Sequence, residues 1–551
     1  MKTKHLTILF VLAVLFTIPQ NLFSQTVIDV PDTYNGNPIG AINNFIMGDT
    51  TSSGERKHPD AIYRLQRGKV YFQDQTMFIN FNFSLVADDD DPKNPTRPPM
   101  IVRAKNAEGA YVRPFMKVRT DSITIKFKNI LFQGIPADEK IVSESVELIN
   151  MAGSNIKLIS DNCIYNYFTY QVFNARSTDH STYIFKNNIF RNDARLNKEY
   201  SGYSLVLSQK VDQDTISIVN NTFFNISAYV LYLKDYTKYV ELVHNTIFTT
   251  AVGALRLPHL LDAKITDNII YNYQTYGQDS SQFAKKHYSI VKIVDIDAAK
   301  LSDLGIKQSD RKAVYKNNVY GWNQKVKKYW QEYNLVPVPW MDDNTDSLFK
   351  FYEGFVDENN IELDPEFDAA MESAVIDKQI KWNEDRRQFG SDYTGFQDRL
   401  YYPDGKLFDL TWPLPENLAY TNQVALKHAQ GGFPVGDLNW FPEEKAKWEV
   451  WTGVEKTSNG SAVPTDYTLS QNYPNPFNPT TVIEFSIPYS GQTTLEVYNV
   501  LGQKVKTLVS KELKAGSYSY QFDANNLASG IYFYKLQSND YSQVKKMMLL
   551  K

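Results

Sequence analysis

The chain has 551 residues and a formal net charge of −4, from 58 basic and 62 acidic side chains. This balance excludes the broad basic surface that nucleic-acid binding requires. The single cysteine, Cys163, excludes an intramolecular disulfide framework, so stability must come from the burial of apolar surface.

The first 24 residues have the pattern of a signal peptide. Lys2 and Lys4 precede an apolar run from Leu6 to Ile18, and Ser24-Gln25 fits a cleavage point. This run of thirteen residues is too short to span a bilayer, which favours a removed signal peptide over a membrane anchor. No later segment is long and apolar enough for a transmembrane helix. We therefore expect an exported chain.

An internal repeat occupies the body of the chain. Seven segments share a pattern that begins with an asparagine. The residue two positions after the asparagine is apolar, and the residue four positions after it is polar in most cases. The leading residues are Asn129, Asn162, Asn188, Asn221, Asn245, Asn268 and Asn318. They are separated by 33, 26, 33, 24, 23 and 50 residues. A step near 24 is one coil of a right-handed parallel β-helix, and the longer steps are coils with an inserted loop.

Each position of the repeat has an expected direction. The leading asparagines should stack in a ladder, with amide groups about 4.8 Å apart. The residues two positions later should point inward, because all are apolar: Leu131, Ile164, Phe190, Phe223, Ile247, Ile270 and Tyr320. One position further, an aromatic stripe should point outward: Phe132, Tyr165, Phe224, Phe248 and Tyr271.

The stripe is suited to stacking on sugar rings. Tyr165, Phe224, Phe248 and Tyr271 are therefore candidate carbohydrate-binding residues. The alternative is that the stripe lies beneath lateral loops or beneath the tryptophan-rich segment that follows the repeat. The sequence leaves both interpretations open.

Alignment of the later strands of successive coils predicts a second outward column. Its members are Phe173, Val206, Tyr232, Arg256 and Lys292, and Lys234 lies two residues beyond Tyr232. The turn that follows aligns Arg176, Gln209, Asp235, His259 and Asp295.

This second column predicts a chemistry. A uronate lyase neutralises the sugar carboxylate with Arg or a metal, which acidifies the neighbouring C–H, and Lys, Arg or His then removes the proton. Lys234, Arg256, His259 and Lys292 are therefore candidate catalytic residues. The alternative is a solvated charged face with structural ion pairs.

Signals for a metal or cofactor are weak. The run Asp88-Asp89-Asp90-Asp91 has the carboxylate oxygens that calcium prefers, but consecutive acids point in alternating directions, which favours a solvated loop. The sequence contains no His-x-His, cysteine pair or H-E-x-x-H, and no G-x-S-x-G or phosphate loop. We expect no cofactor and no metal site.

The repeat ends before a tryptophan-rich region. Residues 25–324 should form the β-helix with its N-terminal cap, since a coiled rod needs both ends covered. Residues 325–452 read as an irregular cap with short helical runs that folds back over the C-terminal coils. Residues 453–466 are a small-polar linker.

The tail, residues 467–551, carries a series of ordered motifs. It opens with N-Y-P-N-P-F-N-P from Asn472, continues with L-A-S-G-I-Y from Leu527, and closes with K-K-M-M-L-L-K from Lys545. Alternating segments such as Val482 to Ile487, broken by Gly and Asn turns, predict a small antiparallel sandwich.

On these motifs the tail resembles the C-terminal sorting domain of the type IX secretion system of Gram-negative bacteria. The resemblance implies that the secretion machinery and its sorting peptidase are partners. It also implies that the mature protein is secreted or stays on the outer cell surface. A generic carbohydrate-binding or adhesive sandwich is the alternative. The coil repeat makes the body resemble the pectate-lyase-like β-helix superfamily.

Two functions remain from the sequence. One is an exported β-helix protein that binds extracellular polysaccharide. The alternative is a polysaccharide lyase or hydrolase acting on uronate-containing glycans. The fold serves both classes, and the catalytic arginine and lysine signatures of pectate and alginate lyases do not stand out in this chain. Whether the protein is an enzyme is therefore left open.

Overall fold

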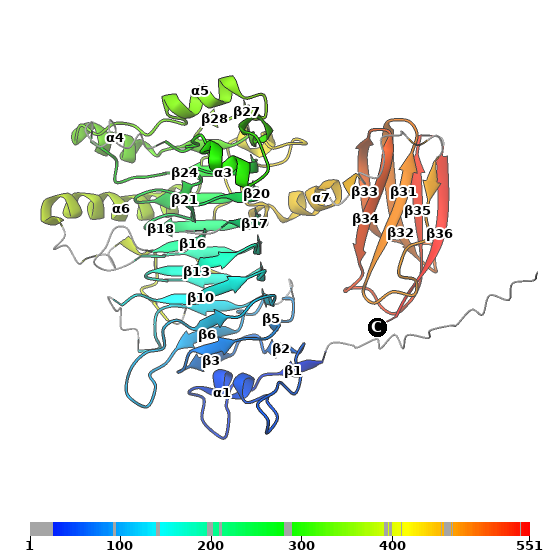
Figure 1. Ribbon diagram of the computed structural model, residues 1–551, viewed down its shortest axis with the longest axis horizontal. Coiled ribbons are helices and arrows are strands. Elements are labelled where there is room, and N and C mark those ends of the chain that lie inside the picture. Colours follow the sequence, from blue (N-terminus) through cyan, green and yellow to red (C-terminus); the bar gives the residue numbers. More distant parts are fainter. Residues whose placement is uncertain are drawn as a thin grey trace, which may run out of the picture.

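The computed structural model describes residues 26–91, 95–138, 144–194, 202–208, 212–279, 289–390, 395, 399–408, 410–452, 455–456, 464, 467–539 and 541–550. The predicted signal peptide lies outside the described residues, and so does most of the predicted linker. A coiled body is followed by a sandwich near the C-terminus (Figure 1).

Within the described residues, the body consists of three parallel sheets to which successive coils add one strand each. The first sheet runs in the order β1 (Val27–Asp29), β2 (Ile62–Leu65), β5 (Phe83–Ala87), β8 (Thr124–Lys128), β11 (Lys157–Asp161), β14 (Thr182–Lys186), β17 (Gln213–Val219), β20 (Thr237–Val243), β23 (Leu260–Thr266), β25 (Lys312–Lys316) and β27 (Phe355–Glu358). The second runs in the order β3 (Val70–Gln73), β6 (Met100–Arg103), β9 (Leu131–Gln133), β12 (Ile164–Asn166), β15 (Ile189–Arg191), β18 (Thr222–Ile226), β21 (Thr246–Thr250), β24 (Ile269–Tyr271), β26 (Val319–Gly321) and β28 (Ile361–Glu362). The third runs in the order β4 (Met77–Ile79), β7 (Met116–Arg119), β10 (Glu147–Ser154), β13 (Gln171–Asp179), β16 (Tyr203–Ser208), β19 (Leu231–Leu233) and β22 (Leu255–Arg256).

The predicted fold class is confirmed, because long parallel sheets make up the body and antiparallel strands make up the tail. The coils continue to Glu362, past the predicted boundary at residue 324.

A ladder of buried asparagine amides joins the coils between the first and second sheets. Asn188 Nδ2 donates to Asn221 Oδ1 at 2.9 Å, and the same bond recurs along the axis with donor–acceptor distances of 2.8–3.1 Å through Asn245, Asn268, Asn318 and Asn360. Each amide oxygen also accepts a backbone N–H from the preceding coil, as Asn245 Oδ1 does from Asn221 at 3.0 Å. The predicted ladder is confirmed for these coils.

In the first two repeat segments, which begin at Asn129 and Asn162, the predicted register is wrong by one residue. Ile164 pairs with Ile189, so Asn162 aligns with Asn187 and not with Asn188. Asn129 and Asn162 have φ of 61° and 53°, in the left-handed region that asparagine tolerates better than most residues. Asparagine is therefore favoured at two adjacent positions of the coil, and the sequence pattern alone does not distinguish these positions.

The register changes which side chains fill the interior. Phe190, Phe223, Ile247 and Ile270 lie in the central core and Tyr320 packs against it, as predicted, but Leu131 and Ile164 point outward. Phe132 and Tyr165 take the interior positions, and their rings stack at 5.5 Å.

The tryptophan-rich region also differs from the prediction. Helices α4 (Gln324–Glu332) and α5 (Asp343–Phe351) lie in the insertion between β26 and β27, and α6 (Ala369–Phe389) lies beside the coils (Figure 1). The described residues between 363 and 441, here called the strap, cover the outer face of the second sheet. Leu400, Tyr402 and Leu410 of the strap reach the early coils at Met100. The region therefore covers the body lengthwise as well as its C-terminal coils.

Buried polar contacts fix the strap to the coils. Arg191 Nη2 donates to Glu416 Oε2 at 3.0 Å, and neither side chain is exposed. Thr222 donates to the Asp437 carboxyl at 2.7 Å, and burial raises the pKa of Asp437 to about 7. At Gly436, φ is +79° and an added Cβ would lie 2.5 Å from Thr246 Oγ1, so only glycine allows this approach.

Short helices cover the two ends of the body. Helix α1 (Ala41–Met47) packs against β3, and α5 packs against β27. Other short helices are α3 (Ala298–Asp303), η1 (Gln308–Asp310), η4 (Ala425–Lys427), η5 (Leu438–Trp440) and α7 (Pro442–Thr452).

The tail forms an antiparallel sandwich around its own apolar core. One sheet contains β29 (Glu455–Lys456), β34 (Gly516–Asp523), β31 (Thr480–Ile487) and β30 (Thr468–Leu469). The other contains β33 (Lys504–Leu513), β32 (Gly491–Asn499), β35 (Gly530–Ser538) and β36 (Tyr541–Leu549). Strand β29 belongs to the predicted linker, so part of that linker is built into the sandwich.

Candidate functional site

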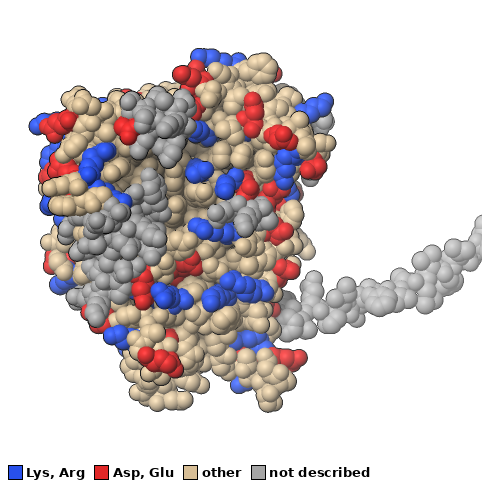
Figure 2. Space-filling view, turned by 60° about the vertical axis from the view of Figure 1, so that its left-hand side comes forward, with Lys and Arg blue, Asp and Glu red and all other residues tan. Residues whose placement is uncertain are grey.

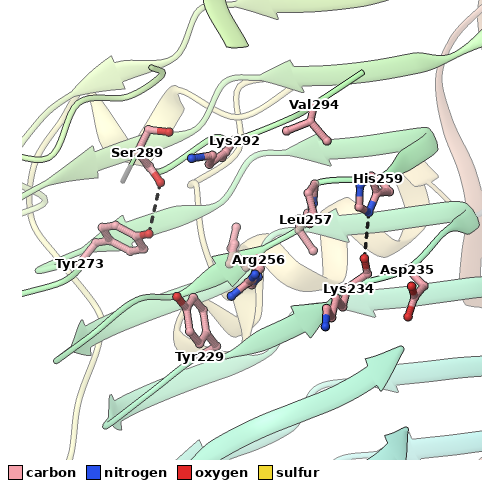
Figure 3. A pocket seen from close by; sticks show the side chains of 12 residues that line it. Tyr229, Lys234, Asp235, Arg256, Leu257, His259, Tyr273, Ser289, Lys292 and Val294 are labelled. Atoms are coloured by element: carbon pink, nitrogen blue, oxygen red, sulfur yellow. Dashed lines mark hydrogen bonds between the residues drawn. The ribbon is translucent and has the colours of Figure 1, made fainter. Parts of the chain in front are cut away.

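A pocket of about 670 Å³ lies where the third sheet ends at β22 (Figure 3). The end of β19, strand β22, the turn that leads into β23 and the segment from residue 289 to 294 surround it. Its lining residues are Tyr229, Lys234, Asp235, Leu255, Arg256, Leu257, Pro258, His259, Tyr273, Ser289, Lys292 and Val294.

The pocket contains every residue that the sequence predicts as catalytic: Lys234, Arg256, His259 and Lys292. Arg256 pairs with Tyr232, and Tyr232 with Val206, as the predicted column requires. The first member of that column is wrong, since Asn174, not Phe173, pairs with Val206. Lys292 lies beyond the edge strand of the described sheet and reaches the pocket from the neighbouring segment.

One hydrogen bond sets the proton position on His259. Its Nδ1 lies 2.8 Å from the backbone oxygen of Lys234 (Figure 3). Because a carbonyl can only accept, Nδ1 carries the proton, and in the neutral ring Nε2 keeps its lone pair. The ring also lies 5.0 Å from the ring of Tyr236. His259 is thus held in the tautomer that a general base needs.

The cations of the pocket differ in their surroundings. The Lys292 ammonium lies 3.6 Å from Asp342, whose carboxylate also caps helix α5. The Arg256 guanidinium lies 5.1 Å from the centre of the Tyr232 ring. Lys234 and Arg256 are both exposed, so their charges are available to a ligand.

Asp235 is the one carboxyl group among the lining residues that the structure describes. Burial raises its pKa, and the His259 imidazole, when protonated, and the Lys234 ammonium oppose the rise. Its Oδ2 is buried and accepts no hydrogen bond from the described part of the chain. The sequence places Asp235 in the turn column but does not single it out.

Two tyrosines of the pocket were missed as site residues. Tyr229 precedes β19, and Tyr273 donates to the backbone oxygen of Ser289 at 3.2 Å (Figure 3). Tyr229 opens the same Y-V-L-Y-L-K run that contains Tyr232 and Lys234, so the spacing within this run could have indicated it.

The predicted surface position of the aromatic stripe is wrong. Tyr165 lies in the central core, while Phe224, Phe248 and Tyr271 lie beneath the strap, and none of the four has any exposed surface. The centre of the Phe248 ring, for example, lies 5.2 Å from the centre of the Phe367 ring in the strap. The alternative interpretation, that the stripe is covered, describes these three residues.

The acidic run is paired with cations. Asp88, Asp89 and Asp90 lie within 3.5 Å of Arg64, Lys128 and Arg67, respectively. These pairs already neutralise the carboxylates that a calcium ion would need. Over the described ranges, no cluster of three or more His, Cys, Asp or Glu side chains could hold a metal.

Residues 471–550 match the family model described as a secretion system C-terminal sorting domain. The chain carries this sorting domain. It is therefore exported by the type IX secretion system, to the cell surface or beyond it. No curated protein matches the chain. In the described part, no helix is long and apolar enough to cross a membrane.

The structure explains the motifs of the sorting domain. Asn475 accepts a hydrogen bond from the backbone N–H of Met548 at 2.9 Å, and Phe477 pairs with Leu549 and is buried in the sandwich core. The opening motif and the closing motif therefore lie side by side and hold the last strand in place. The pocket belongs to the body, so the sorting domain contributes no lining residue.

Proposed function

We propose that the exported body binds an acidic polysaccharide in the pocket at β22. The observation that carries this proposal is the convergence of Lys234, Arg256 and Lys292 in one pocket with a single described carboxyl group, Asp235. Ammonium and guanidinium groups form short, strong hydrogen bonds with carboxylates. The volume also lies within the range of about 300–1,000 Å³ that ligand sites occupy.

Further features agree with this ligand class. Basic side chains recur down the middle of the face turned to the viewer in Figure 2. Tyr229 and Tyr273 add aromatic surface to the pocket. The export route places the protein where extracellular glycans are found. In this proposal the sorting peptidase of the secretion system removes the sorting domain after transport.

Replacing Lys234 and Arg256 with alanine should lower the affinity for uronate polymers about 100-fold or more, because each charged hydrogen bond contributes roughly 1.5–3 kcal/mol. The measurement is titration of the full chain with pectate and with alginate, at low and high salt. Binding should weaken with salt, since the charges are exposed and screened.

The matched control replaces Lys157 and Lys264 with alanine; both are exposed on the first sheet and neither lines the pocket. This variant should bind as the unchanged chain does. The proposal would be contradicted if the pocket variant bound uronate polymers as tightly as the unchanged chain does. It would also be contradicted if the unchanged chain bound a neutral polymer with the same affinity.

A second function, a uronate lyase, is favoured by the tautomer of His259. Glycoside hydrolysis commonly uses two carboxyl groups on either side of the bond, and the described lining offers only Asp235. Elimination needs one base and one acid. This difference favours a lyase over a hydrolase.

The proposed elimination balances within the pocket. Arg256 and Lys234 neutralise the sugar carboxylate, and His259 Nε2 removes the proton beside it. The electron pair of that C–H bond forms a carbon–carbon double bond as the glycosidic C–O bond breaks. The leaving oxygen takes its proton from Asp235 in the acid form, toward which burial shifts the pKa of this carboxyl.

The lyase proposal predicts that His259→Ala loses roughly 100-fold to 10,000-fold in rate while it still binds the polymer. The measurement is the ultraviolet absorbance of the unsaturated product released from pectate or alginate. The control is His428→Ala, since His428 contacts the Asn359 backbone away from the pocket. If the unchanged chain releases no product from either polymer, the lyase proposal fails and the binding proposal stands.

A further inference from the structure

Three tyrosines cluster next to the pocket on neighbouring coils. Tyr203 begins β16, Tyr229 precedes β19 and Tyr232 lies within β19. The rings of Tyr203 and Tyr229 stack at 5.9 Å with an angle of 16° between them. Tyr232 meets both edge-on, at 5.8 Å and 5.7 Å. Tyr203 and Tyr232 are partly exposed.

The tyrosine cluster is continuous with the pocket. Tyr229 lines the pocket beside Arg256 (Figure 3), and Arg256 lies over the ring of Tyr232. Gly253 of the next coil makes room for Tyr229, because an added Cβ would lie 2.7 Å from its ring. The position of the Tyr229 ring is thus fixed by the backbone of its neighbour.

A second arginine lies on the far side of the cluster. Arg176 belongs to β13, which pairs with β16, and its guanidinium lies 5.6 Å from the centre of the Tyr170 ring. The charges of both Arg176 and Arg256 act on Tyr203: burial raises the pKa of Tyr203, and the two cations oppose the rise. The surface from β22 to β13 therefore has a cation at each end and aromatic rings between them.

We propose that Tyr203, Tyr229, Tyr232 and Arg176 form a second subsite next to the pocket. The ligand is then a linear acidic polysaccharide that lies along the axis of the β-helix. Three steps between neighbouring strands, from β22 to β13, span roughly 14 Å. This length exceeds one sugar ring, so the ligand places a ring on the tyrosines and carboxylates at both arginines. The inference rests on the binding function proposed above.

The experiment compares a uronate dimer with a uronate hexamer, both from pectate, by titration of the full chain. The hexamer should bind the unchanged chain about tenfold more tightly than the dimer. In the variant Tyr203→Ala, whose side chain does not line the pocket, the hexamer should lose about fivefold, because one aromatic contact is worth about 1 kcal/mol. The dimer should bind this variant as before, which also shows that the pocket is still folded.

Two further variants separate the roles of the rings and the charge. Arg176→Ala should weaken hexamer binding and its salt dependence, and leave the dimer unaffected. Tyr333→Ala, at a partly exposed tyrosine on another part of the body, should change neither. A hexamer preference that persists in both the tyrosine variant and Arg176→Ala overturns the second subsite while the binding function stands. Absence of binding by either oligomer to the unchanged chain overturns the binding function itself.

Discussion

Replacing Glu416 with alanine should lower the free energy of unfolding by about 3–5 kcal/mol, because the change leaves the buried charge of Arg191 without its counterion. Both side chains are fully buried in the structure. Arg191 also donates to Asn166 Oδ1 at 3.1 Å and to the backbone oxygen of Tyr401 at 3.3 Å. These neutral acceptors share its hydrogen atoms but do not neutralise its charge.

Urea unfolding followed by circular dichroism measures the effect. The double variant Arg191→Met with Glu416→Met should cost less than Glu416→Ala alone, since no unpaired charge then remains in the interior. The matched surface control is Glu358→Ala, which breaks the exposed pair with Lys316 and should cost less than about 1 kcal/mol. A cost below 1 kcal/mol for Glu416→Ala would mean that the strap is not fixed by this ion pair.

The coil repeat was predictable because a ladder of identical amides leaves a strong periodic signal. Asn221, Asn245 and Asn268 are bonded to one another, so the same residue is required at a fixed step in each coil. The register of the first two repeat segments was less predictable. Asn162 lies in the left-handed position one residue earlier, and a sequence pattern alone does not separate two neighbouring positions that both favour asparagine.

The aromatic stripe shows what a local pattern misses. An alternating strand shows that Phe224 lies on the face opposite Phe223, but it does not show what covers that face. The strap covers it: the centre of the Tyr401 ring lies 5.4 Å from the centre of the Phe224 ring, although the two residues are 177 positions apart in the sequence. Apolar residues on both faces of a parallel strand are typical of burial on both faces.

The pocket was predictable in part because side-by-side strands bring equivalent positions of successive coils together. This geometry places Lys234, Arg256 and His259 next to one another. Tyr273 and Ser289 were harder to foresee, since they belong to a coil that is interrupted by a long insertion. The sequence places Asp235 in the turn after the column, but its distinctive property is a carboxyl oxygen without a partner in the described chain, which only the structure shows.

Replacing Phe248 with alanine should lower the free energy of unfolding by about 3–5 kcal/mol, the usual cost of removing a buried phenylalanine ring. The ring stacks on Phe224 at 5.5 Å and meets Phe367 of the strap edge-on at 5.2 Å. Its removal leaves a cavity between the second sheet and the strap. Thermal or urea unfolding of the full chain measures this loss.

This variant also distinguishes the two interpretations of the stripe. If Phe248 only holds the strap, the folded fraction of Phe248→Ala keeps its affinity for pectate and alginate, because the pocket lies on the third sheet. A sugar-binding residue would show the opposite result, with affinity lost and stability kept. Phe351→Ala is the control for ring removal alone: this side chain is 78% exposed, so its loss should change stability by no more than about 0.5 kcal/mol.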